Sequence, residues 1–273
     1  MSEFNPYQQP QSDVAVESAS GLIVHAPVRR PLGAGTRWLS DAWALFVKDP
    51  GVWIGGVLVL WLVGIAAGMF PFIGYFLGVV INPLIYAGAY IVAHKSDRGD
   101  AVRFEDFFAG FQWRTGSLLA LGGISLVIMV AVFVVLGLVG WQISGDDFST
   151  LGANWAALSN GDAAAISQLP DIFYIKLLLI VLIWMLLLIP YAALMWFALP
   201  LVVLSEEMTI GRALKWSFVG CIKNIIPMTL YSIVLFLLIL IGMIPALLGL
   251  LVVMPLLIIS LYTSFRDIYV DAH

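Results

Sequence analysis

Six long apolar runs determine what this chain can fold into, because about 20 apolar helical residues are enough to cross the hydrocarbon core of a membrane. Hydrophobic residues make up 62% of the 273 residues and charged residues only 11%, where globular domains have about 25% charged residues. The pattern predicts an all-α membrane protein with six transmembrane helices. We expect these helices near residues 52–70, 72–93, 117–140, 172–204, 227–245 and 246–265.

The basic residues are unevenly distributed along the chain. Twelve of the 13 Lys and Arg residues lie in four polar stretches between the apolar runs, and Lys176 is the exception. Cytoplasmic loops of membrane proteins carry an excess of Lys and Arg. We therefore expect both termini in the cytoplasm, and the loop 141–171, which has four aspartates and no basic residue, on the outer side. Within this loop, Phe148, Leu151, Trp155 and Leu158 have the spacing of a short surface helix.

Two segments depart from a simple series of spans. Residues 1–35 are rich in Pro, Gln and Asn near their start, a composition that favours a disordered tail, or alternatively a short docking peptide, ahead of a six-helix domain at 36–273. The fourth run is 33 residues long, or about 50 Å as a helix. We expect it to bend, with Pro190 inside it and Pro200 near its end, and the alternative is a re-entrant segment.

The chain contains signs of an internal repeat. A shift of 172 residues aligns three pairs of residues: Phe46 with Phe218, Pro83 with Pro255, and Tyr90 with Tyr262. Around each pair the order is the same, namely an aromatic amphipathic segment, a span, a short turn and a span with a central proline. The middle of the chain follows this order too. We therefore expect three units, at 36–97, 98–204 and 205–273, with pseudo-threefold symmetry about the membrane normal.

Each unit begins with an amphipathic segment. In the first and third of these, aromatic and apolar residues lie on one face and basic residues largely on the other, which is typical of helices lying in the membrane interface. The simplest interpretation is that these segments anchor the spans. The alternative is contact with anionic lipid headgroups or with a partner helix. The candidate contact residues are Arg37, Trp43, Lys48, Arg103, Arg114, Arg212, Lys215 and Lys223.

Prolines near the middle of the second, fourth and sixth runs suggest hinges or a cavity. Pro83, Pro190 and Pro255 each remove one helical hydrogen bond, and the freed carbonyl must be satisfied within the membrane. The prolines either shape the bundle or surround a cavity. Asn82 is the most polar residue at the apparent membrane centre. It could bond a neighbouring helix or line a pore, and we favour the structural bond.

Several classes of function find no support in the sequence. The spans lack interior ionisable residues, which coupled pumps and transporters generally use. The three histidines lie in separate polar segments, no metal-binding or phosphate-binding motif occurs, and the single Cys221 fits a small apolar filler. A net charge of −4 argues against nucleic acid as a partner. We therefore expect no enzymatic activity, no cofactor and no metal site.

The segments AWALFVKDPGVW, HKSDRGD followed by FEDFFAGF, and ALKWSFVGCIKNIIP through SLYTSFRDI resemble uncharacterised bacterial inner-membrane families of six helices. They are more distantly similar to the membrane domain found beside some glycerophosphodiester phosphodiesterases. The resemblance covers about residues 36–270. It implies the bacterial cytoplasmic membrane but no activity, because the phosphodiesterase catalytic domain is absent from these residues.

These observations favour a non-enzymatic membrane protein that acts as a scaffold or accessory, or that senses the bilayer. Its partners would be membrane lipids and another membrane or cytoplasmic protein. The alternative is a channel, a lipid-handling protein or an uncoupled transporter with a path between the proline-containing helices. A wide hydrated cavity would favour transport and a tightly packed bundle would favour a scaffold. A closed ring of three units would be complete as a monomer.

Overall fold

The computed structural model describes residues 22–70, 73–161, 171–244 and 247–270, and these residues form helices and connecting segments without strands. Six helical stretches among them are long and apolar enough to cross a membrane, so the chain is a multi-pass integral membrane protein. The elements in chain order are α1 (Ala34–Phe46), α2 (Pro50–Gly68), α3 (Ile73–Arg98), the 3-10 helix η1 (Phe104–Phe111), α4 (Thr115–Ser159), α6 (Asp171–Met195), α7 (Ala198–Leu204), α8 (Ile210–Lys223), α9 (Ile225–Met243) and α10 (Leu250–Tyr269).

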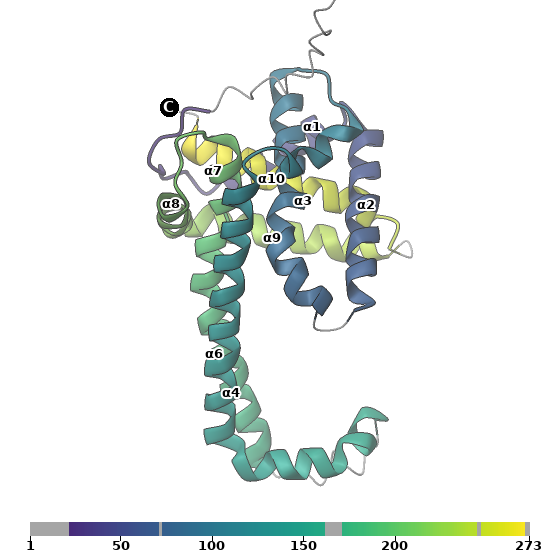
Figure 1. The fold of residues 1–273 in the computed structure, drawn as a ribbon, viewed down its shortest axis with the longest axis vertical. Coiled ribbons are helices and arrows are strands. Elements are labelled where there is room, and N and C mark those ends of the chain that lie inside the picture. Colours follow the sequence, from purple (N-terminus) through teal and green to yellow (C-terminus); the bar gives the residue numbers. More distant parts are fainter. Residues whose placement is uncertain (1–21, 71–72, 162–170, 245–246, 271–273) are drawn as a thin grey trace, which may run out of the picture.

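The three hairpins extend in different directions from one common end of the molecule. Helices α4 and α6 form a long arm, and the α2–α3 hairpin runs beside its upper part, whereas α9 and α10 run across the long axis (Figure 1). Helix α10 packs across both α2 and α3. The six spans therefore meet at one end and diverge from it, which differs from the expected ring of helices around a single axis.

Each amphipathic segment packs on a hairpin from another third of the chain. Helix α1 contacts α9 and α10, η1 contacts α2 and α3, and α8 contacts α6 and α7. Glycines allow close approach at two of these contacts, because a side chain at Gly88 would collide with the carbonyl of Phe107 and one at Gly35 with the carbonyl of Pro227. The contacts are therefore cyclic: the segment of the first third packs on the last hairpin, that of the second third on the first hairpin, and that of the last third on the middle hairpin.

Buried aromatic pairs reinforce two of these contacts. Trp38 of α1 meets Tyr231 of α9 edge to face, with ring centroids 6.1 Å apart. Phe107 of η1 meets Trp53 of α2 in the same way at 5.6 Å. Edge-to-face pairs are favourable beyond the area they bury. In both cases an aromatic residue on the first helix of a hairpin holds the amphipathic segment that covers it.

The ends of α3, α7 and α10 contact one another where the hairpins meet, and α1, η1 and α8 pack around them. We call this region the polar junction and define it by six charged residues: Arg30, Arg37, Asp41, Asp97, Arg266 and Asp267. Tyr90 and Tyr262, paired by the sequence shift, are both buried beside it. Burial is uneven among the spans. In α10, two thirds of the most apolar stretch is buried inside the protein, whereas in the fourth span none of the corresponding stretch is buried.

The bend of the fourth span lies close to Pro200 and not at Pro190. Helix α6 continues through Pro190 to Met195, and α7 begins at Ala198. Proline at position 200 has no N–H to donate to the carbonyl of Trp196, and it is well tolerated in the first turn of a new helix. The break therefore falls just before it.

Part of the segment expected to be disordered is ordered in the structure. Residues 1–21 lie outside the described residues, but residues 22–33 run as a strap along the polar junction. Backbone N–H groups of Leu22 and His25 donate to the carbonyls of Leu204 and Tyr269, at 2.8 and 2.9 Å. The composition signal comes from the first residues of the chain, while Leu22 and Val24 of the strap pack on the core.

The segment expected as an outer loop at 141–171 is helical as far as Ser159. It continues α4, which runs from Thr115 to Ser159, and its final part turns aside at the far end of the arm (Figure 1). The helical spacing noted between residues 148 and 158 thus belongs to one continuous helix. Residues 162–170 lie outside the described part of the chain.

Candidate functional site

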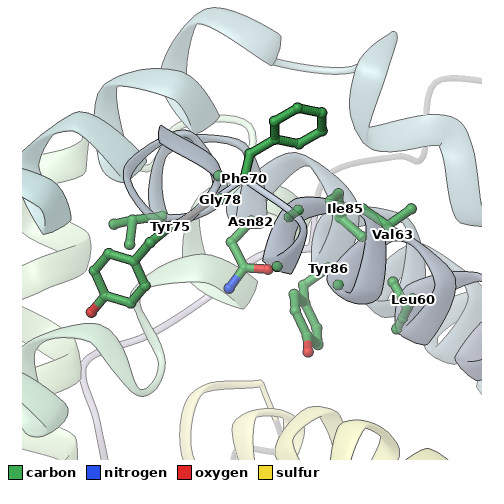
Figure 2. Close-up of a pocket in the computed structure, with 13 residues that line it drawn as sticks. Leu60, Val63, Phe70, Tyr75, Gly78, Asn82, Ile85 and Tyr86 are labelled. Atoms are coloured by element: carbon green, nitrogen blue, oxygen red, sulfur yellow. The ribbon is translucent and has the colours of Figure 1, made fainter. Parts of the chain in front are cut away.

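A groove between the two helices of the first hairpin is the cavity that involves a predicted site residue. Its volume is about 410 Å³. Asn82 lines it, in a wall that is otherwise apolar or aromatic apart from two tyrosines (Figure 2). The lining residues are Leu60, Val63, Gly64, Ala67 and Gly68 from α2, Phe70, and Gly74, Tyr75, Gly78, Val79, Asn82, Ile85 and Tyr86 from α3.

Asn82 and Tyr86 are the polar groups of this groove that have no hydrogen-bond partner among the described residues. They are one helical turn apart and project to the same side of α3 (Figure 2). Tyr75 differs, since its hydroxyl contacts the sulfur of Met129 at 3.4 Å. The structural bond that we favoured for Asn82 is therefore not formed within the described part of the chain, and its side chain is exposed at the groove. Tyr86 was missed in the sequence, although the i, i+4 spacing to Asn82 places it on the same face.

The three central prolines do not gather around this groove. Pro83 is buried in α3 next to Asn82, and Pro255 is buried in α10. Pro190 is exposed on the arm. The helices continue through all three, so none of them ends a span. Of the residues predicted as a hinge or cavity, only Asn82 lines the groove.

A second cluster of polar groups surrounds Asp267 at the polar junction. Asp267 is 8% exposed, and its carboxylate pairs with Arg30 at 3.1 Å and with Arg37 at 2.8 Å. The indole N–H of Trp38 donates to the same carboxylate at 2.7 Å. Three elements, the strap, α1 and α10, are thus joined at one acidic side chain that the sequence had not singled out.

A neighbouring network joins α1, α3 and α10. The Asp97 carboxylate lies 2.5 Å from Arg266 and accepts a hydrogen bond of 2.8 Å from the Tyr262 hydroxyl, which also contacts His94 at 3.1 Å. Asp41 is 3.5 Å from Arg266. Burial raises the pKa of the Asp41 carboxyl above its ordinary value, against the opposing effect of Arg266 and Arg37. These groups hold the helices together at the junction.

The strap is also held by Asn224, which is fully buried between α8 and α9. Its side-chain oxygen accepts a hydrogen bond of 2.7 Å from the backbone N–H of Arg30, and its nitrogen donates to the carbonyl of Val28 at 2.8 Å. Lys223 donates to the carbonyl of Pro27 at 2.9 Å. A buried amide that is satisfied by a distant backbone fixes the path of that backbone.

Four of the basic residues predicted to contact lipid or a partner bind within the protein. Arg37 pairs with Asp267 and Lys223 with the strap. Lys48 donates to the carbonyl of Ser96 at 2.8 Å. Arg114, with a positive φ of 51°, donates to the carbonyls of Val202, Ser205 and Met208 at and beyond the end of α7, where a cation is favoured by the helix dipole.

The other four predicted contact residues are exposed. Trp43 is half exposed on α1, and Arg103 is exposed before η1. Arg212 and Lys215 are exposed on α8, a helix that Figure 1 shows end-on where it crosses the arm. Their side chains have no ionic or hydrogen-bond partner within the described residues. Thr209 begins this helix by accepting a hydrogen bond from the backbone N–H of Arg212.

The described residues contain no group of three or more His, Cys, Asp or Glu side chains that could hold a metal ion. Cys221 is buried, and its thiol contacts the carbonyl of Ala193 at 3.6 Å. Burial raises the pKa of this thiol to about 12. A thiol held in its neutral form is a poor nucleophile and a poor metal ligand.

Comparisons of the chain with protein families, with curated proteins and with solved structures found no match. The resemblance to bacterial six-helix membrane families therefore stays an expectation from the sequence.

Proposed function

We propose that this chain is a non-enzymatic scaffold of the bacterial inner membrane, and that its α4–α6 arm docks another membrane protein. The observation that carries this proposal is the length of the apolar arm relative to the other hairpins. Helix α2, in the hairpin that runs beside the arm (Figure 1), has 19 residues, or about 28 Å. That length matches a hydrocarbon core of about 30 Å.

The apolar part of α4 is much longer than this. It covers 29 residues, Thr115–Ile143, or about 43 Å. At the average helix tilt of about 20° it still spans roughly 40 Å, which exceeds the hydrocarbon thickness by about 10 Å. Leu186 and Ile189 on the partner helix α6 are 69% and 67% exposed. A second membrane protein beside the arm would cover the apolar surface that extends beyond the hydrocarbon core.

We further propose that the chain consists of three repeated units with both ends in the cytoplasm. The cyclic contacts of α1, η1 and α8 with the three hairpins support the repeat. All basic residues named as candidate contacts lie on, or next to, the segments that gather at the polar junction. The positive-inside rule then favours the cytoplasm for that end of the molecule. Arg212 and Lys215 would meet anionic lipid headgroups there.

The docking proposal can be tested by photocrosslinking in native membranes. A photoreactive amino acid at Leu186 or Ile189 should capture the same protein, because both positions lie on one face of α6. Leu62 on α2 is a matched control at 64% exposure and should not capture it. Crosslinks to lipid alone, or the same mixture of abundant proteins at all three positions, would contradict docking by the arm.

A lipid-handling protein or uncoupled transporter is the second candidate, and the α2–α3 groove favours it. The groove contains a polar group at membrane depth and opens to the outside of the hairpin. Purified protein in liposomes should then move labelled lipid or release small solutes faster than protein-free liposomes. Equal rates for the tested substrates would remove this candidate for them.

A further inference from the structure

We propose that the α2–α3 groove binds a lipophilic molecule dissolved in the bilayer, and that a carbonyl group of this molecule accepts hydrogen bonds from Asn82 and Tyr86. The inference goes beyond the docking function of the arm and does not depend on it. It is carried by the groove of about 410 Å³, by the two polar side chains within it, and by their depth in the membrane.

The depth of Asn82 makes its lack of a partner informative. It is the tenth residue of α3, which begins at Ile73, so it lies roughly 14 Å along the helix from that end. This places it near the centre of a hydrocarbon core of about 30 Å. Polar groups without a partner are costly there, and they commonly bond a neighbouring helix or line a functional site. Because no described residue of the chain bonds Asn82, the partner comes from outside the described chain.

The shape of the groove fits a small molecule. Its volume falls within the range of about 300 to 1,000 Å³ that is usual for ligand sites. Gly64, Gly68 and Gly78 have no atom near the place where a Cβ would lie, so the walls stay open at these positions. Phe70 and Tyr75 add aromatic surface at one end (Figure 2). The site therefore combines apolar walls with a few convergent polar groups.

The chemistry of the two side chains selects a carbonyl group. The Asn82 amide has two N–H donors, and the Tyr86 hydroxyl supplies one more. A carbonyl oxygen has two lone pairs and no donor of its own, so two N–H or O–H groups satisfy it completely. Ester carbonyls of phospholipids lie at the membrane surface, far from Asn82. A molecule dissolved within the hydrocarbon core can bring its carbonyl to this depth.

The experiment uses the full-length protein in lipid nanodiscs and two photoreactive probes. One is a long-chain ketone that carries a diazirine on its alkyl chain, and the other is the same chain without the ketone. The labelled fraction of the α2–α3 peptide is measured by mass spectrometry as the probe concentration is raised. We expect the ketone to label this peptide at lower concentration than the hydrocarbon, by roughly three- to tenfold for each hydrogen bond.

Variants separate hydrogen bonding from general partition into the membrane. Asn82→Leu and Tyr86→Phe should each reduce the preference for the ketone by the contribution of one hydrogen bond, and the double variant should remove it, while labelling by the hydrocarbon stays unchanged. The matched control is Ser125→Ala, which breaks the 2.7 Å contact between Ser125 and Tyr191 on the arm and should keep the preference. A melting temperature for each variant confirms that it is folded.

Two results would overturn the proposal. The first is equal labelling by both probes in the wild-type protein. The second is occupation of the groove by another copy of this chain, in which the amides of two Asn82 residues would pair at the same depth. That case is recognised by a disulfide between two chains of the Asn82→Cys variant in a Cys221→Ala background, together with loss of ketone labelling in the wild type.

Discussion

The hydroxyl of Ser217 on α8 accepts a hydrogen bond of 2.9 Å from the backbone N–H of Phe197, at the break between α6 and α7. The same hydroxyl donates to the carbonyl of Ala193 at 2.8 Å. In an unbroken helix this N–H and this carbonyl would bond each other, because they are four residues apart. Ser217 therefore stands between them and satisfies both, which holds the amphipathic helix against the end of the arm.

Replacing Ser217 by alanine should destabilise the protein by about 1 to 3 kcal/mol. The buried N–H of Phe197 loses its partner, and the carbonyl of Ala193 keeps only its contact with the Cys221 thiol. Thermal unfolding of the purified protein in detergent measures the change. The control is Thr229→Ala, which removes an exposed hydroxyl that bonds only the carbonyl of Ile225 in its own helix. If both variants melt at the wild-type temperature, the bridge at the break contributes nothing to stability.

Asp267→Asn should destabilise the polar junction by about 3 to 5 kcal/mol, since it removes the negative charge from a buried pair. Arg30 is 10% exposed beside it and would keep its charge without the carboxylate. The strap should then detach more often, and trypsin should cleave after Arg29 faster in the folded protein, because Pro31 protects the bond after Arg30. The cleavage rate in detergent is the measurement.

The matched control for that change is Arg37→Gln. Arg37 contacts the same carboxylate, but its side chain is 52% exposed, and such pairs contribute about 0 to 1 kcal/mol. Cleavage after Arg29 should stay close to the wild-type rate. Equal acceleration in both variants would mean that the junction responds to any loss of charge, and would contradict a special role for the buried pair.

Two glycines on α3 should respond in opposite ways to alanine. A side chain at Gly88 would meet the backbone of Phe107, while Gly78 has nothing near its Cβ position. Gly88→Ala should cost about 1 to 3 kcal/mol, because η1 must shift away from α3, and Gly78→Ala should leave stability equal or higher. Melting temperatures of the two variants decide this, and a similar loss in both would contradict the close packing of η1.

The spans could be predicted from the sequence because each depends on a local property. The apolar runs are long enough to cross the membrane whatever they pack against, and the predicted and observed ends differ by only a few residues for most helices. The largest difference is in α4, which continues past residue 140 to Ser159. Helix α3 also continues past its predicted end at residue 93, to Arg98. Its last turns carry charged residues that the hydrophobic pattern excluded, and they are helical because Asp97 and His94 have partners on α10.

The contacts that hold the molecule together could not be predicted, since they join residues far apart in the chain. Arg30 and Asp267 are 237 positions apart, and the sequence around either residue does not indicate that the other is its partner. The same is true of Asn224 and the strap. For the groove, the sequence identified Asn82 by its polarity, but whether it bonds a helix or stays open depends on which neighbours surround it, which only the packing decides.

Cys221 should react slowly with alkylating reagents in the folded protein. Burial raises the pKa of its thiol to about 12, so the neutral form dominates until the pH approaches that value, and the reactive thiolate is scarce at neutral pH. Alkylation rates between pH 7 and 9 measure this. Ile222→Cys in a Cys221→Ala background is the control, because residue 222 is 56% exposed and should react rapidly.

Asn82→Leu should leave the stability of the ligand-free protein unchanged or raise it, because the amide bonds no described residue and leucine is the better residue at the membrane centre. Asn224→Leu is the matched control, since this buried amide bonds Arg30, Val28 and Gly220 and its loss should cost about 1 to 3 kcal/mol. Melting temperatures in delipidated detergent compare the two. If the melting temperature falls as much for Asn82→Leu as for Asn224→Leu, the Asn82 amide is needed for packing within the protein. That result would contradict its role in binding a ligand at the groove.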